Sequence, residues 1–234
     1  MSPDTTTFRH FHDQLATLKK RLLEMSERAE ALVDLAVESV LRRDVDKAEA
    51  VIAGDRELDR IELEIEEMAV QLLALQQPMA RDLRFIISAI KITSDLERVG
   101  DHGVNIAQAA TRLVRSHVGI SPEPALEDMA RRARQMLGDA LDAFVRGDGA
   151  LGRAVCARDD QVDALHDSVF RSLLTHMMAD PRTINLALDL MTVSRNLERV
   201  ADLATNIAEE AVFVAEGKTI KHRVEGPEKT VRLG

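Results

Sequence analysis

The sequence predicts an all-α protein made of two tandem, pseudo-symmetric three-helix bundles, and three observations support this prediction. First, the 234 residues are rich in Ala, Leu, Glu and Arg and include only 11 Gly and 6 Pro, a composition that favours helices. Second, apolar residues recur at steps of three and four over six long segments, which is the period of an amphipathic helix. Third, a short motif late in the first half of the chain recurs late in the second half.

Breaks in the periodic pattern give the order of the helices. Pro78 ends the second segment, because a proline disfavours the helical conformation at the residue before it. In the second half, Gly147-Asp148-Gly149 marks one turn and Pro181 marks the next. The six predicted helices cover approximately residues 7–43, 46–76, 80–116, 123–145, 150–178 and 183–215.

Internal repetition divides the chain into two units. The pattern Leu-Glu-Arg-Val-x-Asp at residues 96–101 recurs at residues 197–202, and Asn-Ile-Ala at 105–107 recurs at 206–208. This period is too long for a solenoid repeat and indicates a duplicated helical bundle. The predicted units are a first three-helix repeat at 1–119, a second three-helix repeat at 120–216 and a mobile C-terminal tail at 217–234.

The composition argues against several classes of protein. A net charge of −9 does not suit a nucleic-acid surface, which needs clustered Lys and Arg. The single cysteine, Cys156, excludes an internal disulfide framework and fits a reducing cytosol. The N-terminus has no apolar signal-peptide core, and no run of about 18 apolar residues could span a membrane. We therefore expect a cytoplasmic protein that meets a membrane only through its partners.

The repeated motif carries a pair of carboxylates on each third helix. Glu97 and Asp101 are four residues apart, so they lie within roughly 40° of each other around the helix. They continue an apolar stripe, and Glu198 and Asp202 do the same in the second half. A partly buried carboxylate loses several kcal/mol of solvation unless it is paired. A positive group should therefore lie beside each pair.

Two kinds of positive group fit this requirement. Arg98, Arg199 or a basic residue of a neighbouring helix could form an ion-pair network. Alternatively, several carboxylates could bind a hard metal cation, with support from Asn105 or Asn206. The spacing of the residues leaves both interpretations open.

Acidic residues of the second helix add a second wall to this predicted site. Asp55 and Asp59 recur as Asp159 and Asp163, and we expect these four residues to complete sites that face the third helix of each unit. Acidic residues on a helix usually mark a solvated face. We apply that interpretation to two others, Glu62 and Glu66.

Catalytic signatures are absent from the sequence. It has no Ser/His/Asp set, no phosphate-binding loop and no dinucleotide fingerprint, so we expect a protein that is not an enzyme. One alternative is a di-metal carboxylate enzyme on a helical bundle, which would use Glu-x-x-His ligand pairs. The nearest match, Asp163-x-x-His166, occurs once. Another alternative is a structural helical adaptor that binds no metal.

The motifs LERVGDHGVNIA at 96–107 and LERVADLATNIA at 197–208 resemble those of the PhoU family, the accessory proteins of phosphate-specific transport. Asp55 and Asp59 also match the family pattern, and the resemblance covers nearly the whole chain apart from its tail. One departure is that Asp82-Leu83-Arg84 becomes Thr183-Ile184-Asn185 in the second half, which argues against equivalence of the two sites.

The resemblance implies a function as well as a fold. It implies a homodimer that negatively regulates the phosphate-starvation response and phosphate uptake. It also implies an adaptor between the ATPase subunit of a phosphate ABC transporter and a phosphate-sensing histidine kinase. The motif residues implied to bind metal ions, iron or zinc in some family members, are Glu97, Asp101, Glu198 and Asp202.

Overall fold

The structure is a computed structural model that describes residues 5–76, 78–115 and 124–220, and these ranges contain helices and turns but no strand. The predicted all-α class is therefore confirmed. None of the helices in these ranges is both long enough and apolar enough to cross a membrane. The linker expected around residue 119 and the tail beyond residue 220 lie outside the described residues. The elements are α1 (Thr5–Arg42), α2 (Val45–Gln76), α3 (Ala80–Val114), α4 (Pro124–Arg146), α5 (Gly149–Cys156), α6 (Asp159–Ala179), the 3₁₀ turn η1 (Pro181–Thr183) and α7 (Ile184–Glu216).

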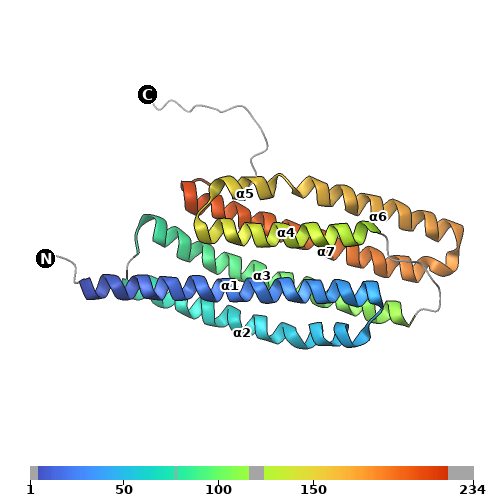
Figure 1. Cartoon of the computed structure of the whole chain (residues 1–234), viewed down its shortest axis with the longest axis horizontal. Helices are drawn as coiled ribbons and strands as arrows, with labels where there is room; N and C mark the ends of the chain where they lie inside the picture. The colour runs from blue at the N-terminus through green and yellow to red at the C-terminus, as the bar shows by residue number, and fades with distance from the viewer. Residues whose placement is uncertain (1–4, 77, 116–123, 221–234) are drawn as a thin grey trace, which may run out of the picture.

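Helices α1, α2 and α3 form one elongated bundle, and α4 to α7 form a second bundle that lies alongside it (Figure 1). Within the bundles, α3 packs against α1 and α2, and α7 packs against α4, α5 and α6. The two bundles meet where α3 packs against α7 and α1 packs against α4. The two helices that carry the repeated motif are thus the central ones.

One predicted helix is divided in two. The apolar pattern predicts a single helix over 150–178, but a turn at Ala157 and Arg158 separates α5 from α6. The Arg158 N–H donates to the Val155 carbonyl oxygen at 2.9 Å, a bond to the third residue back that tightens the backbone at this point.

Helix α5 packs closely on α7. Gly152 lets the two helices approach so closely that an added Cβ would lie 2.8 Å from the carbonyl oxygen of Ala208. Helix α5 is held against α7 at this distance, and the chain turns before α6 begins.

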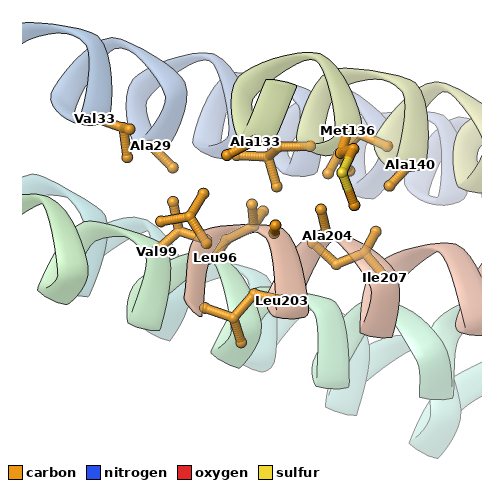
Figure 2. Close-up of a cluster of buried hydrophobic side chains, with 14 of the residues drawn as sticks. Ala29, Val33, Leu96, Val99, Ala133, Met136, Ala140, Leu203, Ala204 and Ile207 are labelled. Atoms are coloured by element: carbon orange, nitrogen blue, oxygen red, sulfur yellow. The ribbon is translucent and has the colours of Figure 1, made fainter. Parts of the chain in front are cut away.

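Buried side chains from both bundles form one continuous hydrophobic core. Each fully buried Leu, Ile or Val stabilises the fold by about 1.5–3 kcal/mol, so this shared core also holds the two bundles together. Figure 2 shows part of it, with labelled residues from α1, α3, α4 and α7: Ala29, Val33, Leu96, Val99, Ala133, Met136, Ala140, Leu203, Ala204 and Ile207.

Polar contacts fix the direction in which α3 and α7 pack. They are Ser88 Oγ to Glu210 Oε2 at 2.7 Å, His102 Nδ1 to Asn196 Oδ1 at 2.8 Å, and Arg112 Nε to Asp189 Oδ1 at 2.6 Å. Residue numbers rise along α3 as they fall along α7, so the two helices are antiparallel. Glu210 is only 2% exposed, and Lys91 Nζ lies 3.1 Å from its Oε1, which gives this buried charge a partner.

We expect Gly152→Ala to lower the free energy of unfolding by about 1–3 kcal/mol, because the new methyl group would press against the α7 backbone. The matched control is Gly138→Ala in α4, where an added Cβ meets only the Glu30 carboxylate at 3.6 Å. That change should raise the free energy of unfolding by about 0.4–1 kcal/mol, because alanine has less conformational freedom in the unfolded chain. Urea denaturation followed by circular dichroism measures both. Equal effects of the two substitutions would contradict the close approach of α5 and α7.

Candidate functional site

In the first bundle, acidic side chains of α2 and α3 gather in one place. This first-half acid cluster consists of Asp55, Asp59 and Glu62 from α2 with Glu97 and Asp101 from α3. The carboxylates lie close enough for their charges to alter one another's pKa values. The expectation that Asp55 and Asp59 face the third helix agrees with this arrangement.

Gly100 makes this approach of α2 to α3 sterically feasible. A Cβ added at Gly100 would clash with Leu58 Cδ1 and would lie 2.9 Å from Asp55 Oδ1. Because Gly100 precedes Asp101, the carboxylate of Asp55 lies against the segment of α3 that carries the motif. The small residue thus positions one wall of the cluster.

Repulsion within this cluster is strong. Burial raises the pKa of Glu97 to about 7, and the charges of Asp101, Glu62, Asp59 and Asp55 add to the rise. The pKa of Asp55 is raised as well, first by burial and then by Asp59 and Asp101. In the described part of the chain, neither Glu97 nor Asp101 has an ion pair with a basic side chain. The negative charge here is therefore uncompensated.

The second bundle holds a matching second-half acid cluster: Asp159 and Asp163 from α6 with Glu198 and Asp202 from α7. Burial raises the pKa of Asp159 to about 6, with further contributions from Asp163 and Asp202. The pKa values of Asp163 and Glu198 are also raised, in both cases mainly by burial. The structure thus brings together the acidic residues that the repeat predicts in each half.

Arginine compensates only one of the two clusters. The guanidinium of Arg199 lies 3.1 Å from Asp202 Oδ2 and 3.6 Å from Glu198 Oε2. Its repeat counterpart, Arg98, instead pairs with Asp95 at 3.5 Å. The ion-pair alternative therefore describes part of the second-half cluster, whereas the first-half cluster has no such partner among the described residues.

The two motif asparagines have different surroundings. Asn105 is exposed on α3, one turn beyond Asp101, and makes no hydrogen bond within the described residues. Asn206 lines a polar pocket of about 260 Å³ between α3, α6 and α7, together with Asp159 and Asp202. The asparagine of the second half thus lines a pocket between the two bundles.

Two residues near the clusters were not predicted to belong to them. Glu62, which the sequence placed on a solvated face, is half-buried and contributes to the raised pKa of Glu97. His166 is its repeat counterpart, at the same offset of 104 that relates Asp55 to Asp159. Aligning the two repeats position by position was the signal that could have identified them.

His166 is held in place by Ser194. Its Nδ1 lies 2.7 Å from Ser194 Oγ, and the Ser194 hydroxyl donates to Met129 Sδ at 3.4 Å. The contact with Ser194 holds the imidazole ring of His166 beside the second-half acid cluster. The ring also lies close enough to lower the pKa values of Asp163 and Glu198 in part.

The chemistry of both clusters suits cations better than any other ligand. Carboxylate oxygens are the preferred ligands of hard metal ions, and the second half adds an imidazole, which suits zinc and iron. Among the described residues, no three His, Cys, Asp or Glu side chains are arranged so that they could hold a metal ion together. The Thr205 side chain lies close enough to Asp159 to donate a hydrogen bond, which offsets part of the rise in the pKa of Asp159. The carboxylate and imidazole groups are suitable metal ligands, and these side chains would have to rotate in order to bind a metal ion.

Comparison with known sequences gives a consistent result. A family model described as the PhoU domain matches residues 22–110 and again residues 126–211, one match in each half of the chain. A phosphate-specific transport system accessory protein PhoU homolog from Caulobacter vibrioides is 40% identical over 214 residues, which cover 92% of this chain and 93% of the relative. A protein of the same name from Zymomonas mobilis is 35% identical, over 94% of this chain and 92% of its own.

Solved structures agree with these sequence matches. The crystal structure of PhoU from Pseudomonas aeruginosa superposes with a TM-score of 0.85 at 35% sequence identity, covering 89% of this chain and 100% of that one. The phosphate transport system regulatory protein PhoU from Streptococcus pneumoniae gives a TM-score of 0.83 at 28% identity, covering 90% of this chain and 99% of that one. The similarity therefore spans both bundles.

The raised pKa of Glu97 leads to a prediction about stability. The Glu97 carboxyl binds its proton more tightly in the folded chain, where its pKa is about 7, than in the unfolded chain, where its pKa has the ordinary value of 4.5. Its contribution to the free energy of unfolding should therefore fall as the pH rises from about 4.5 to 7. Glu97→Gln cannot titrate and should lose less stability than the wild type between pH 5 and pH 8. Urea denaturation with a chelator present measures this difference. Glu67→Gln, at an exposed position of α2, is the control, and an unchanged pH dependence in Glu97→Gln would contradict the prediction.

Proposed function

Because the chain belongs to the PhoU family, we propose that it is a metal-binding accessory protein that restrains phosphate uptake and the phosphate-starvation response. The observation that carries the metal-binding part is the pair of acid clusters at repeat-related positions with raised carboxyl pKa values. Among the described residues, no basic side chain forms an ion pair with Glu97 or Asp101. The role in phosphate transport comes from the names of the relatives.

Metal ions would be held mainly by Glu97 and Asp101 in the first half and by Glu198 and Asp202 in the second. Asp55 and Asp59 support the first site, Asp159 and Asp163 support the second, and Asn105 and Asn206 lie one turn further along α3 and α7. A bound cation would neutralise carboxylates that repel one another as they stand. Metal binding and carboxylate ionisation are linked, because a protonated carboxyl is a poor ligand. Iron and zinc are the metals that the family resemblance suggests.

The proposed activity is regulation by binding, with no catalysed reaction. The thiol of Cys156 is a poor nucleophile at neutral pH, because burial, with a smaller contribution from Glu209, raises its pKa to about 11. A di-metal enzyme remains the competing function, favoured by the Asp163-x-x-His166 spacing on α6. A metal-free adaptor is favoured by the pairing of Arg199 with Asp202.

Exposed apolar side chains support a role in protein contacts. Leu83 and Ile87 of α3 are 37% and 40% exposed, and Ile184 and Leu188 of α7 are 41% and 51% exposed. The two pairs are related by the same offset of 101 that relates Glu97 to Glu198. Repeated apolar exposure is typical of interaction surfaces. The proposed partners are a phosphate ABC transporter ATPase subunit, a phosphate-sensing histidine kinase and a second copy of the chain, all in the cytoplasm.

We expect the double change Asp101→Asn and Asp202→Asn to lower the amount of bound metal at least several-fold, because amides are poorer ligands than carboxylates for hard cations. The measurement is elemental analysis of protein purified without chelators, together with manganese titration by calorimetry. Glu67→Gln with Glu127→Gln is the control, since it removes two charges at exposed positions of α2 and α4. Absence of metal from the wild type, or equal metal in both double variants, would favour the metal-free adaptor.

Deleting the gene should switch on phosphate-starvation genes in phosphate-rich medium or leave phosphate uptake unrestrained. The reason is that a regulator of this kind acts by occupying partners in one of their states, and its loss releases them. A starvation-promoter reporter and phosphate uptake, both measured at high phosphate, test this expectation. Normal repression together with normal uptake, in a strain with no second copy of the gene, would count against the regulatory role. Loss of a specific enzymatic turnover without change in phosphate control would favour the di-metal enzyme.

A further inference from the structure

The side of α6 that carries the second-half acid cluster continues as an apolar surface toward the turn between α6 and α7. Steps of three and four residues lead from Asp163 through His166 to Phe170 and Leu174. Residues at these steps lie on one side of a helix. The side chain therefore changes from acidic to apolar along a single row.

Helix α7 carries a matching row. Ile184 and Leu188 lie in line with Arg195 and Glu198, at steps of four, seven and three residues. The charges of Asp163 and Glu198 are close enough to affect each other, so the rows of α6 and α7 belong to the same side of this helix pair.

The two rows lie side by side at one end of the molecule, where α6 and α7 meet (Figure 1). Thr183 Oγ1 donates to the carbonyl oxygen of His176 at 3.2 Å, which closes the turn and brings Leu174 level with the stretch between Ile184 and Leu188. We call this surface the α6–α7 apolar face. Its large apolar residues are each between 41% and 79% exposed: Phe170, Leu174, Met178, Ile184 and Leu188.

The first bundle shows that the fold does not require the most prominent of these residues. At the offset of 104 that relates α2 to α6, the counterparts of Phe170 and Arg171 are Glu66 and Glu67. Charged side chains are thus compatible with the packing of the bundle at both positions. A large exposed aromatic ring at position 170 is better explained by contact with another molecule.

The charge around this face is positive, although the chain as a whole carries −9. Within the described residues, Arg171 and Arg195 form no ion pair, whereas Asp180 and Asp189 are each paired with an arginine. Between the acid cluster and the end of α6, the helix has a single further acid, Asp167. Arginine charge is therefore available to a partner here.

A groove of about 490 Å³ extends the face toward the end of α3. Leu188 forms part of its wall, and Arg112 and Arg115 of α3 form another part. Arg112 Nε lies 2.6 Å from Asp189 Oδ1, and Arg115 has no ion pair in the part of the chain that the structure describes. The groove thus places a second basic group beside the exposed apolar residues.

The spacing of the apolar residues suits a helix as the partner. Phe170, Leu174 and Met178 are four residues apart and span about 12 Å along α6, which is slightly more than two helical turns. A helix lying along the face would present one apolar side chain to each of these levels, as in other helix-in-groove contacts. Its flanking positions would face the arginines.

We propose that the α6–α7 apolar face binds an acidic amphipathic helix of a partner protein. The apolar side of that helix covers Phe170, Leu174 and Leu188, and its carboxylates pair with Arg171 and Arg195. Charge complementarity selects this occupant over a basic one. The inference rests on the proposed function, since it gives a chemical description to one of the protein partners. Metal bound at the second-half acid cluster would remove negative charge beside the face, so the two proposals are compatible.

The test uses the full-length, chelator-treated chain and two fluorescent helical peptides of about 18 residues. One peptide has leucine at every third or fourth position and glutamate at the flanking positions, and its twin has lysine in place of each glutamate. We expect saturable binding of the acidic peptide by fluorescence anisotropy, and at least about tenfold weaker binding of the basic twin. Non-specific attraction to a chain of net charge −9 would give the opposite order.

Variants assign the binding to this face. Phe170→Glu with Arg171→Glu introduces the residues of the first bundle and should weaken binding of the acidic peptide at least tenfold. Leu63→Asp, which likewise introduces a repeat counterpart at an exposed position of α2, is the control and should leave binding unchanged. Ile184→Ser with Leu188→Ser removes apolar contacts without a change of charge and should also weaken binding. Circular dichroism of each variant verifies the fold.

Several results would overturn this inference. They are preference for the basic twin, and unchanged binding of the acidic peptide in the Phe170→Glu and Arg171→Glu variant. Binding of phosphatidylglycerol vesicles without binding of either peptide would assign the face to a lipid surface instead. Self-association that this variant abolishes, again without peptide binding, would assign the face to a second copy of the chain.

The same double variant separates this failure from that of the proposed function. It changes no proposed metal ligand, so it should bind as much metal as the wild type and yet fail to repress the starvation reporter in the deletion strain. Peptide binding together with a normal deletion phenotype would support the face and overturn the regulatory role. A deletion phenotype that the variant fully rescues would overturn the face alone.

Discussion

The antiparallel contact between α3 and α7 is the feature on which the rest of the structure depends. Each of these helices is the centre of its own bundle, and each also buries a face against the other, so little of either surface is left for solvent. The carboxylates of the repeated motif lie on the remaining strip, beside α2 in one bundle and α6 in the other, where Asp101 is exposed and Glu97, Glu198 and Asp202 are partly buried. Partial burial of Glu97 and Glu198 follows from this geometry, and burial is the main cause of their raised pKa values.

The same contact explains where polar residues occur in the core. Glu210 is buried, but Ser88 and Lys91 of the opposite bundle satisfy it. Removing one partner of such a buried pair usually costs several kcal/mol, because the remaining charge is left unpaired. The register of α3 on α7 is therefore set by directed bonds as well as by apolar packing, and the pocket between the bundles has a fixed set of walls.

Much of this organisation could be predicted from the sequence, and the failures have physical causes. Helical periodicity gave six segments because buried faces of long amphipathic helices repeat every three to four residues. The duplicated motif gave the acid pairs, and Asp55 and Asp159 were placed correctly because their spacing is repeated. The break at Ala157 was missed because the apolar pattern of residues 150–178 continues across it. The pocket was missed because Arg98 and Asp159 are brought together only by packing of the two bundles.

Duplication has produced two sites with the same acidic residues and different electrostatic balance. In the second half, Arg199 supplies positive charge to Asp202 and Glu198, and His166 replaces Glu62, so this cluster is partly neutralised by the chain itself. In the first half, Arg98 turns to Asp95 and the cluster carries an additional carboxylate. A cation from solution would gain more from the first cluster, because it would relieve more repulsion there. Divergence of a few side chains around a common acid pair is therefore enough to give the two halves a different balance of charge.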